Sequence, residues 1–265
     1  MNACRQIEII LFDLRGCALY HTMSIGYARQ SSTGESVSQP EFDKFSKSYS
    51  DSIGNAVEVF GKDHDFFVRN KADTLLSAFQ SLGADARKLQ VLDIGCGVGL
   101  VHRYIKNAVG SLRGTDVSGA SLDIARMENP GVAYESYDGV NLPYPDASFD
   151  VAYAICVLHH VPVPQWQKFI DEMRRVVRPG GHILLIEHNP LNPATQYVVR
   201  NAPMDENAVL VWPHRLRSLM RAAGLLNPDT RYILFTPFEG GFFRRLDGFL
   251  RRIPLGTQYV MEARV

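Results

Sequence analysis

The stretch Val91-Leu92-Asp93-Ile94-Gly95-Cys96-Gly97-Val98-Gly99 decides the fold. It begins as an apolar run of strand length and ends in three glycines at alternate positions. Glycine lets the backbone turn sharply after a strand, and it lets a ligand approach without interference from a Cβ atom. Residues 100–109 follow directly with apolar side chains at helical spacing. The stretch therefore predicts a strand, a tight glycine loop and a helix.

The same alternation of strands and helices continues downstream. Strands are predicted at 111–116, 132–138, 149–157, 182–188, 231–236 and 258–265, and helices at 118–128, 164–177 and 213–223. Upstream of the glycine loop, apolar spacings of three and four predict helices over 41–60 and 65–82. Repeated βα units imply an α/β fold with a mostly parallel, doubly wound sheet.

Composition bounds the domain organisation and the partners. With 265 residues and 46% hydrophobic composition, the chain can bury a full core. Its 28 basic and 28 acidic residues cancel, so no global field draws it to nucleic acid, and a small or lipid-like partner fits better. Residues 1–40 contain a short apolar patch followed by QSSTGESVSQP (30–40), a polar stretch rich in Ser and Gly. This predicts a poorly ordered extension before a single domain over 41–265.

Two alternatives remain for this N-terminal part. An ordered strand over Ile7–Phe12 would replace the poorly ordered extension. We also hypothesise that translation begins at Met23, which mass spectrometry of the native protein would test.

The cysteines and the apolar runs indicate the cellular compartment of the protein. Four cysteines form no CxxC pair and no cysteine–histidine spacing typical of a zinc site, so we expect reduced thiols and no metal. The apolar run between Ile7 and Tyr20 is broken by charged residues and makes neither a signal peptide nor a membrane span. We therefore expect a soluble, cytoplasmic protein.

Acidic residues at the ends of three successive strands indicate the ligand. Leu100 occupies the position where a dinucleotide fingerprint would place Gly or Ala, which counts against NAD. Asp93 would face a pyrophosphate unfavourably, but it suits the ammonium and sulfonium of S-adenosylmethionine (SAM). Asp116 is placed to accept hydrogen bonds from ribose hydroxyls, and Asp138, followed by Gly139, from an adenine amino group.

These segments resemble the class I SAM-dependent methyltransferases, particularly the branch similar to ubiquinone and menaquinone biosynthesis enzymes. The resemblance is carried by VLDIGCGVG, TDVSGASLDIAR, LPYPDASFDVAYAICVLHHV and RVVRPGGHILLIEH, and it covers about residues 41–265. It implies a Rossmann-like sheet of seven strands with an antiparallel last strand, SAM at the carboxyl edge, and lid helices over 41–82.

The resemblance also completes the set of SAM-binding residues. It implies that Val117 packs on adenine and that Ala154 lies beside the methionine part of SAM. The predicted cofactor-binding set is Asp93, Gly95, Cys96, Gly97, Gly99, Asp116, Val117, Asp138, Gly139 and Ala154. Cys96 is placed in this set for its small size in the loop, with no catalytic role.

Methyl transfer needs little acid–base machinery, because the sulfonium methyl is already electrophilic and positioning supplies much of the rate. A protonated acceptor still needs a base. His160 is the first candidate and His159 the second, both just past the fourth core strand, with His188 past the fifth. LHHV equally fits a packing or capping histidine. Tyr49 resembles a family tyrosine near the cofactor, or else packs in the lid.

Two segments exceed what the common fold needs and are predicted to lie on the substrate side: residues 189–212 and 237–257. Within the second, residues 242–253 combine an apolar helical face with four arginines. Such a helix can rest on an anionic membrane surface, or it can simply pack on the sheet with solvated arginines.

The sequence thus predicts an enzyme that methylates a small molecule, for example a lipid, quinone precursor, sugar or other secondary metabolite. The alternatives are a SAM-binding partner protein without catalysis and, less favoured, an NAD-dependent oxidoreductase. A protein or RNA acceptor is disfavoured, because neither a basic groove nor a recognition domain is evident.

Overall fold

The computed structural model describes residues 9–12, 18–21, 64–83, 85–202, 205–235 and 241–265. It forms two compact units, Met1–Ser38 and Gln39–Val265. In the first, β1 (Ile9–Phe12) and β2 (Ala18–His21) form an antiparallel hairpin that pairs Ile9 with His21. The predicted helix over 41–60 and Tyr49 lie outside the described residues.

Seven strands form the sheet of the second unit. They are β3 (Gln90–Ile94), β4 (Ser111–Asp116), β5 (Ala133–Ser136), β6 (Phe149–Ile155), β7 (Val177–His188), β8 (Leu226–Ile233) and β9 (Gln258–Arg264). Their order is β5-β4-β3-β6-β7-β9-β8, with β3 to β7 parallel and β9 antiparallel to both its neighbours. The predicted seven-stranded α/β fold with an antiparallel last strand is confirmed.

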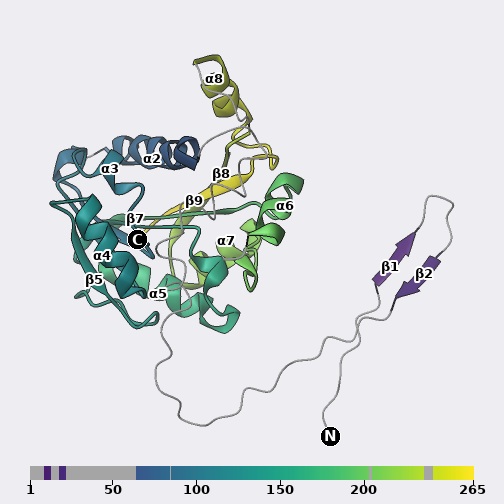
Figure 1. The fold of residues 1–265 in the computed structure, drawn as a ribbon, viewed down its shortest axis with the longest axis horizontal. Coiled ribbons are helices and arrows are strands. Elements are labelled where there is room, and N and C mark those ends of the chain that lie inside the picture. The colour runs from purple at the N-terminus through teal and green to yellow at the C-terminus, as the bar shows by residue number, and fades with distance from the viewer. Residues whose placement is uncertain (1–8, 13–17, 22–63, 84, 203–204, 236–240) are drawn as a thin grey trace, which may run out of the picture. The chain divides into compact units, whose positions relative to one another are not determined.

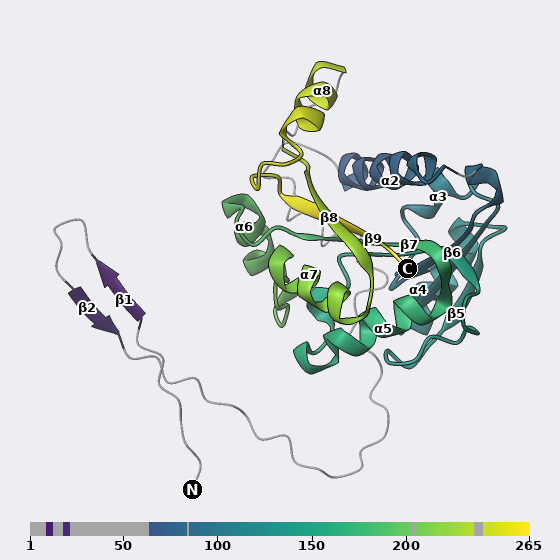
Figure 2. The ribbon, with the colours of Figure 1, turned by 180° about the vertical axis from the view of Figure 1, so that it is seen from behind.

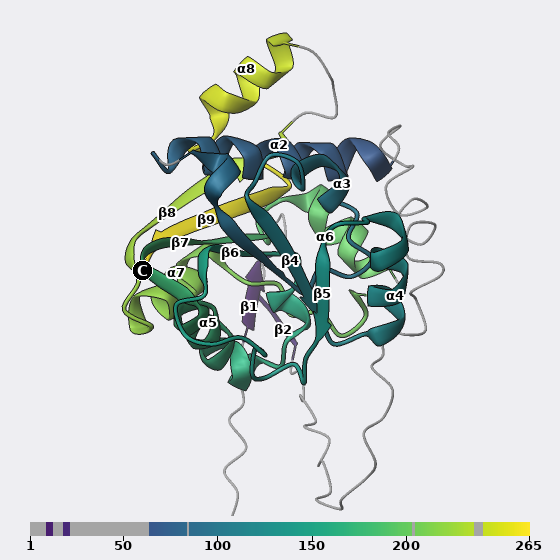
Figure 3. The same cartoon turned by 90° about the vertical axis from the view of Figure 1, so that its left-hand side faces the viewer.

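Helices cover both faces of this sheet (Figures 1 and 3). The α-helices are α2 (His64–Ser81), α3 (His102–Ile105), α4 (Gly119–Glu128), α5 (Trp166–Val176), α6 (Pro193–Asn201), α7 (Pro213–Ala222) and α8 (Gly241–Leu250). Helices α2 and α3 share one buried cluster with the sheet, whereas α5 and α7 share another on the opposite face, also visible from behind in Figure 2.

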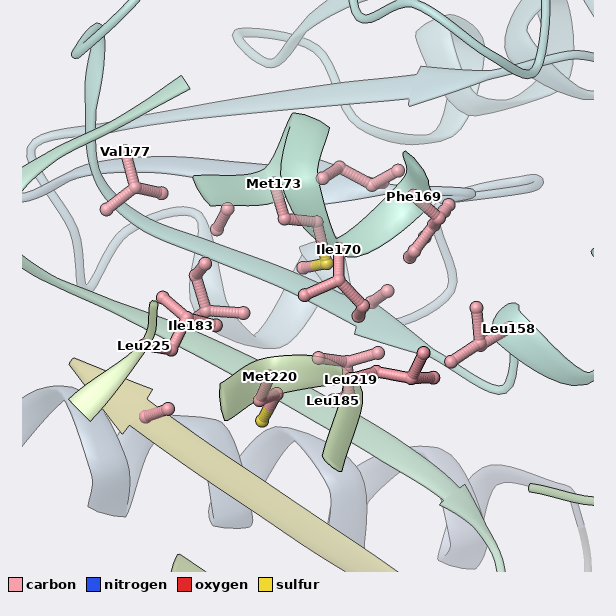
Figure 4. Close-up of a cluster of buried hydrophobic side chains, with 14 of the residues drawn as sticks. Leu158, Phe169, Ile170, Met173, Val177, Ile183, Leu185, Leu219, Met220 and Leu225 are labelled. Atoms are coloured by element: carbon pink, nitrogen blue, oxygen red, sulfur yellow. The ribbon is translucent and has the colours of Figure 1, made fainter. Parts of the chain in front are cut away.

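The alternation of side chains along β3 explains the two layers. Val91 packs in the cluster of α2, while Leu92 and Ile94 pack in the cluster of α5. In the α5 cluster, side chains of α5, α7 and β7 converge, and Leu158 joins them from a short 3-10 turn, η3 (Leu158–His160) (Figure 4). Burial of Leu158 therefore fixes the start of the turn that carries both candidate histidines.

Several elements differ from their predicted bounds; β8, for example, was predicted over 231–236 and spans Leu226–Ile233. The helix after the glycine loop was predicted over 100–109, but α3 ends at Ile105, and turns then lead the chain back to β4. β7 begins at Val177 instead of 182, with a register irregularity between Phe149 and Val151 of β6. A Cβ at Gly181 would lie 2.5 Å from the Asp150 carbonyl oxygen, so the strands approach more closely there than any other residue allows.

The strand order predicts a ligand crevice beside β3. The chain runs from β3 to β4 and β5 on one side, and it then returns to place β6 and β7 on the other. Loops leaving neighbouring strands in opposite directions open a crevice at the carboxyl ends of the strands, where ligands of open α/β sheets bind. The glycine loop and the turn η3 are the two loops that flank this point.

A buried carboxylate ties α5 to the connection before β6. Glu172 accepts hydrogen bonds from the Leu142 backbone N–H at 2.9 Å and from Arg175 at 2.8 Å, and Lys168 also contacts it. These donors, Arg175 first, lower the pKa of Glu172 to about 2 despite partial burial. The ionised carboxylate thus contributes stability above pH 4.5, its ordinary pKa, and that contribution is lost as the pH falls toward 2.

Replacing Glu172 with Gln should reduce the free energy of unfolding at neutral pH by about 1–3 kcal/mol, because charge-assisted hydrogen bonds are lost. Chemical denaturation at pH 7 and at pH 3 measures the effect, and the difference between wild type and variant should shrink at the lower pH. Glu128→Gln, at an exposed site on α4, is the matched control. An equal difference at both pH values would refute the assigned ionisation.

Candidate functional site

The glycine loop is anchored to β4 and to the end of β6. The N–H of Gly95 donates to the Thr115 carbonyl at 2.7 Å. A Cβ at Gly95 would lie 2.6 Å from a methyl of Val157, so the loop touches the residue just before η3. Gly97 has φ +53° with open space where its Cβ would be. Its backbone is therefore left uncovered for a ligand.

Asp116, at the end of β4, holds the glycine loop in place. One carboxylate oxygen accepts from the Gly97 N–H at 2.7 Å, and the other accepts from the Ser118 N–H at 2.9 Å. Burial raises the pKa of Asp116, against the opposing effect of these two donors. Each oxygen retains a further lone pair, which leaves acceptor capacity for ligand hydroxyls.

Asp93 has a partner that sequence reasoning did not identify. Its carboxylate contacts Nε2 of the buried His102 at 2.8 Å, and Nδ1 of the same ring contacts the Tyr134 hydroxyl at 2.7 Å. The chain of three side chains joins β3, α3 and β5. These side chains pack directly against the glycine loop. A Cβ at Gly99 would lie within 3.1 Å of His102, Tyr134 and Asn129.

The end of β5 meets the end of β4 through Gly139 and Val117. A Cβ at Gly139 would lie 3.3 Å from a methyl of Val117, and Gly139 has φ +82°. Asp138 is exposed, and its carboxylate accepts from the backbone N–H groups of Val140 and Asn141 at 2.8 and 2.6 Å. The carboxylate thus organises its own loop, and its predicted contact with adenine stays a prediction.

Two other predicted residues pack inside the protein. Ala154 is fully buried in the cluster of α5, one residue before the end of β6, so its predicted contact with methionine rests on the resemblance alone. Cys96 packs against β4, where a Cβ at Gly114 would lie 2.8 Å from its sulfur. Burial raises the pKa of the Cys96 thiol, which fits the predicted steric role better than reactivity.

Glu187, near the end of β7, fixes the turn η3. It is fully buried, and it accepts from the N–H groups of Val157 and Leu158 at 3.2 and 2.8 Å. Its other oxygen lies 2.6 Å from Nδ1 of His159, which is only 1% exposed. Burial alone would lower the pKa of His159, but the Glu187 and Asp205 carboxylates outweigh it and raise this pKa to about 10.

The pKa values of the two other histidines of the cluster are lowered. Nε2 of His160 lies 3.4 Å from Asp205, and the ring centroid of His188 lies 5.0 Å from that of His159. Burial, followed by the charge of His159, lowers the pKa of His160 to about 4 and that of His188 to about 3. His160 is the more accessible of the two predicted catalytic residues, whereas His159 is buried.

Comparison with known proteins identifies the family. A methyltransferase domain model matches residues 92–185. The ubiquinone biosynthesis O-methyltransferase of Paraburkholderia phymatum is 31% identical over 167 residues, which are 58% of this chain and 71% of that protein. The chain belongs to the class I SAM-dependent methyltransferases. SAM is therefore its methyl donor, and the prediction of an enzyme of this class is confirmed.

Other similar proteins differ in how much of the chain they match. The phthiotriol/phenolphthiotriol dimycocerosates methyltransferase of Mycobacterium leprae is 32% identical, and the match covers 42% of each chain. A possible histamine N-methyltransferase from Thermotoga maritima shares the fold, with a TM-score of 0.60 and 20% identity over 84% of this chain and 97% of that one. The methyltransferase thus resembles enzymes named for different acceptors.

No helix in the described part of the methyltransferase combines the length and apolar character that crossing a bilayer requires.

Three functional residues of this edge escaped the sequence reasoning. Glu187 carried a signal, since a lone acid inside the apolar run HILLIEH must find a buried partner. His102 sits at helical spacing on the glycine-loop helix and showed no such signal. Asp205 lies in a polar connection far along the chain, and the neighbouring sequence does not indicate that its side chain reaches the histidines.

We propose that Asp116 binds the ribose of SAM, and we predict that Asp116→Asn weakens SAM binding about 10- to 100-fold. The variant loses charge-assisted hydrogen bonds worth about 1.5–3 kcal/mol. Isothermal titration calorimetry with SAM measures this, and NAD should give no heat with either protein. Asp123→Asn, an exposed change on α4, should bind SAM normally. Unchanged affinity in a folded Asp116→Asn protein would remove the assignment.

Proposed function

We propose that this methyltransferase transfers the SAM methyl group to a hydroxyl oxygen of a small molecule held at the turn η3. The observation that carries the proposal is the contact of Gly95 with Val157, which places the glycine loop directly against the segment leading into His159 and His160. The donor loop and the only histidine pair of the described residues thus share one edge of the sheet.

The histidine turn supplies what an acceptor hydroxyl needs. A hydroxyl becomes a good nucleophile when its proton is removed or its oxygen is bound to a cation. His160 is partly exposed beside Asp205, and we propose it as the residue that meets the acceptor. His159 is held by Glu187 from behind, and we propose that it orients this turn and sets its charge.

Names of relatives support a hydrophobic or aromatic acceptor. The Paraburkholderia protein is named for ubiquinone biosynthesis, and the Mycobacterium leprae protein for phthiotriol and phenolphthiotriol dimycocerosates. Quinone precursors and lipids were both among the acceptors predicted from the sequence. Exposed apolar side chains in the predicted acceptor-covering segment 189–212 favour the same class: Leu191, Tyr197, Val209 and Trp212.

A second proposal concerns contact with anionic membranes through residues 242–253. Phe249 of α8 is 83% exposed, and Ile253 is exposed beyond the end of the helix. Arg245 and Arg251 are exposed in the same segment. Apolar groups beside cationic ones favour the interface of an anionic bilayer. Delivery of a lipophilic acceptor would benefit from such contact.

The reaction itself is tested by mass spectrometry of S-adenosylhomocysteine formed with a library of phenols, lipids and sugars. We expect turnover with a hydroxylated member, and His160→Gln should lower kcat about 100-fold or more while SAM affinity is unchanged. His214→Gln, at an exposed site on α7, is the matched control. Unchanged kcat in His160→Gln at saturating SAM would exclude this residue from the reaction.

Co-sedimentation with liposomes tests the membrane proposal. The wild type should pellet with phosphatidylglycerol vesicles and remain in solution with phosphatidylcholine vesicles. Phe249→Ser should reduce pelleting severalfold, whereas Met127→Ser, which removes a side chain 73% exposed on α4, should not. Equal pelleting with neutral and anionic vesicles would reject the proposal.

A further inference from the structure

We infer that His159, His160 and Asp205 form a binding site for a divalent transition-metal ion of the zinc type. The three residues come from η3 and from the connection after α6, and each offers one ligand atom. These atoms all lie within 4.8 Å of one another. The cysteine and histidine spacing of the sequence predicts no metal, because Asp205 joins the cluster only through the fold.

The separations of Asp205 from the two histidines are close to those of a tetrahedral shell. Asp205 Oδ1 lies 3.4 Å from Nε2 of His160 and 3.7 Å from Nε2 of His159. Bonds of about 2.1 Å from a tetrahedral zinc ion separate its ligand atoms by about 3.4 Å. Asp205 thus lies at about the distance from each histidine nitrogen that a shared zinc ion requires, and the two histidine ligand atoms lie within 4.8 Å of each other.

The buried nitrogen of His159 is the independent sign of a missing partner. Among the described residues, its Nε2 has no hydrogen-bond partner, although the side chain is 99% buried. Buried polar atoms of this kind call for an explanation, and an unoccupied ligand position is one. The nearest carboxylate oxygen, that of Asp205, is too far for a hydrogen bond and at a suitable distance for a shared ion.

The other nitrogen of the same ring has the partner that metal-binding histidines require. Nδ1 of His159 lies 2.6 Å from Glu187, whose carboxylate is itself held by two backbone N–H groups. A carboxylate behind a histidine fixes the ring's orientation and its tautomer, and it increases the basicity of the nitrogen that binds metal. Glu187 would therefore be a positioning residue for the ion.

Charge and donor type favour zinc over magnesium. Two buried carboxylates, Glu187 and Asp205, lie on either side of the His159 ring. A divalent cation bound at Nε2 in place of a proton would balance their two negative charges. Imidazole nitrogens suit zinc, iron, nickel and copper, whereas magnesium prefers an all-oxygen shell. Three protein ligands leave a coordination position open, as in catalytic zinc sites. That this position receives the acceptor oxygen rests on the proposed function.

Metal binding is measured on the full chain without acceptor. After exhaustive chelation, equilibrium dialysis against Zn²⁺ with elemental analysis gives stoichiometry and affinity, and Co²⁺ gives a visible spectrum that reports tetrahedral coordination. We expect one tight Zn²⁺ per wild-type chain and no comparable binding of Mg²⁺. His214→Gln should retain that ion, because His214 is exposed and outside the cluster.

Variants of the cluster decide the assignment. Asp205→Asn is nearly isosteric, and it should weaken Zn²⁺ binding at least tenfold, as should His160→Gln. Glu187→Gln should weaken it about 10- to 100-fold through the orientation of His159. Circular dichroism and SAM calorimetry establish that each variant is folded.

Two results would overturn the inference: a wild type that retains no Zn²⁺ above the His160→Gln level, or an Asp205→Asn protein that binds Zn²⁺ as the wild type does. If the wild type binds no Zn²⁺ but binds SAM and forms S-adenosylhomocysteine, the metal site is rejected and the proposed function stands. If Zn²⁺ binds but no acceptor in the library is methylated, the proposed function fails and the metal site stands.

Discussion

Three buried carboxylates at the tips of parallel strands hold the site together. Asp93 is paired with His102, Asp116 accepts two backbone N–H groups, and Glu187 accepts two more together with His159. A buried charge must find such partners or unfold the segment that carries it. Each carboxylate therefore fixes the segment that supplies its hydrogen-bond donors. The need to give every buried carboxylate a partner thus shapes the carboxyl edge of the sheet.

The fold was readable from the sequence because its signals are local. β4 lies at the predicted 111–116, a segment that follows the glycine-loop helix and ends in an acidic residue. The helix after the glycine loop was predicted too long, because helical spacing continues through residues that must turn back toward β4. Contacts between residues that are far apart in the sequence could not be predicted. Nothing local tells that Asp93 meets His102, or that Asp205 lies beside the histidine pair.

The fold alone does not determine the reaction. A [4+2]-cyclase shares it with a TM-score of 0.51 and 20% identity over 72% of this chain, alongside structures described as methyltransferases. What these proteins have in common is the doubly wound sheet, which creates a crevice at the switch between β3 and β6. The chemistry must therefore be set by side chains that the sheet does not require. In this chain we propose that His159, His160 and Asp205 are such residues.

We expect the choice of acceptor to depend on segments 189–212 and 237–257, which are joined by hydrogen bonds. The buried amide of Asn189, at the end of β7, donates to the carbonyls of Gly256 and Pro254 at 2.7 and 3.1 Å, and Asn192 donates to that of Leu255. The segment 189–212 is thereby tied to the end of 237–257. Loops joined by hydrogen bonds from buried amides lose little further entropy when a ligand binds, which increases affinity without new contacts. Side chains along these segments can thus change, and with them the acceptor that is recognised, while the hydrogen bonds of Asn189 keep the backbone geometry constant.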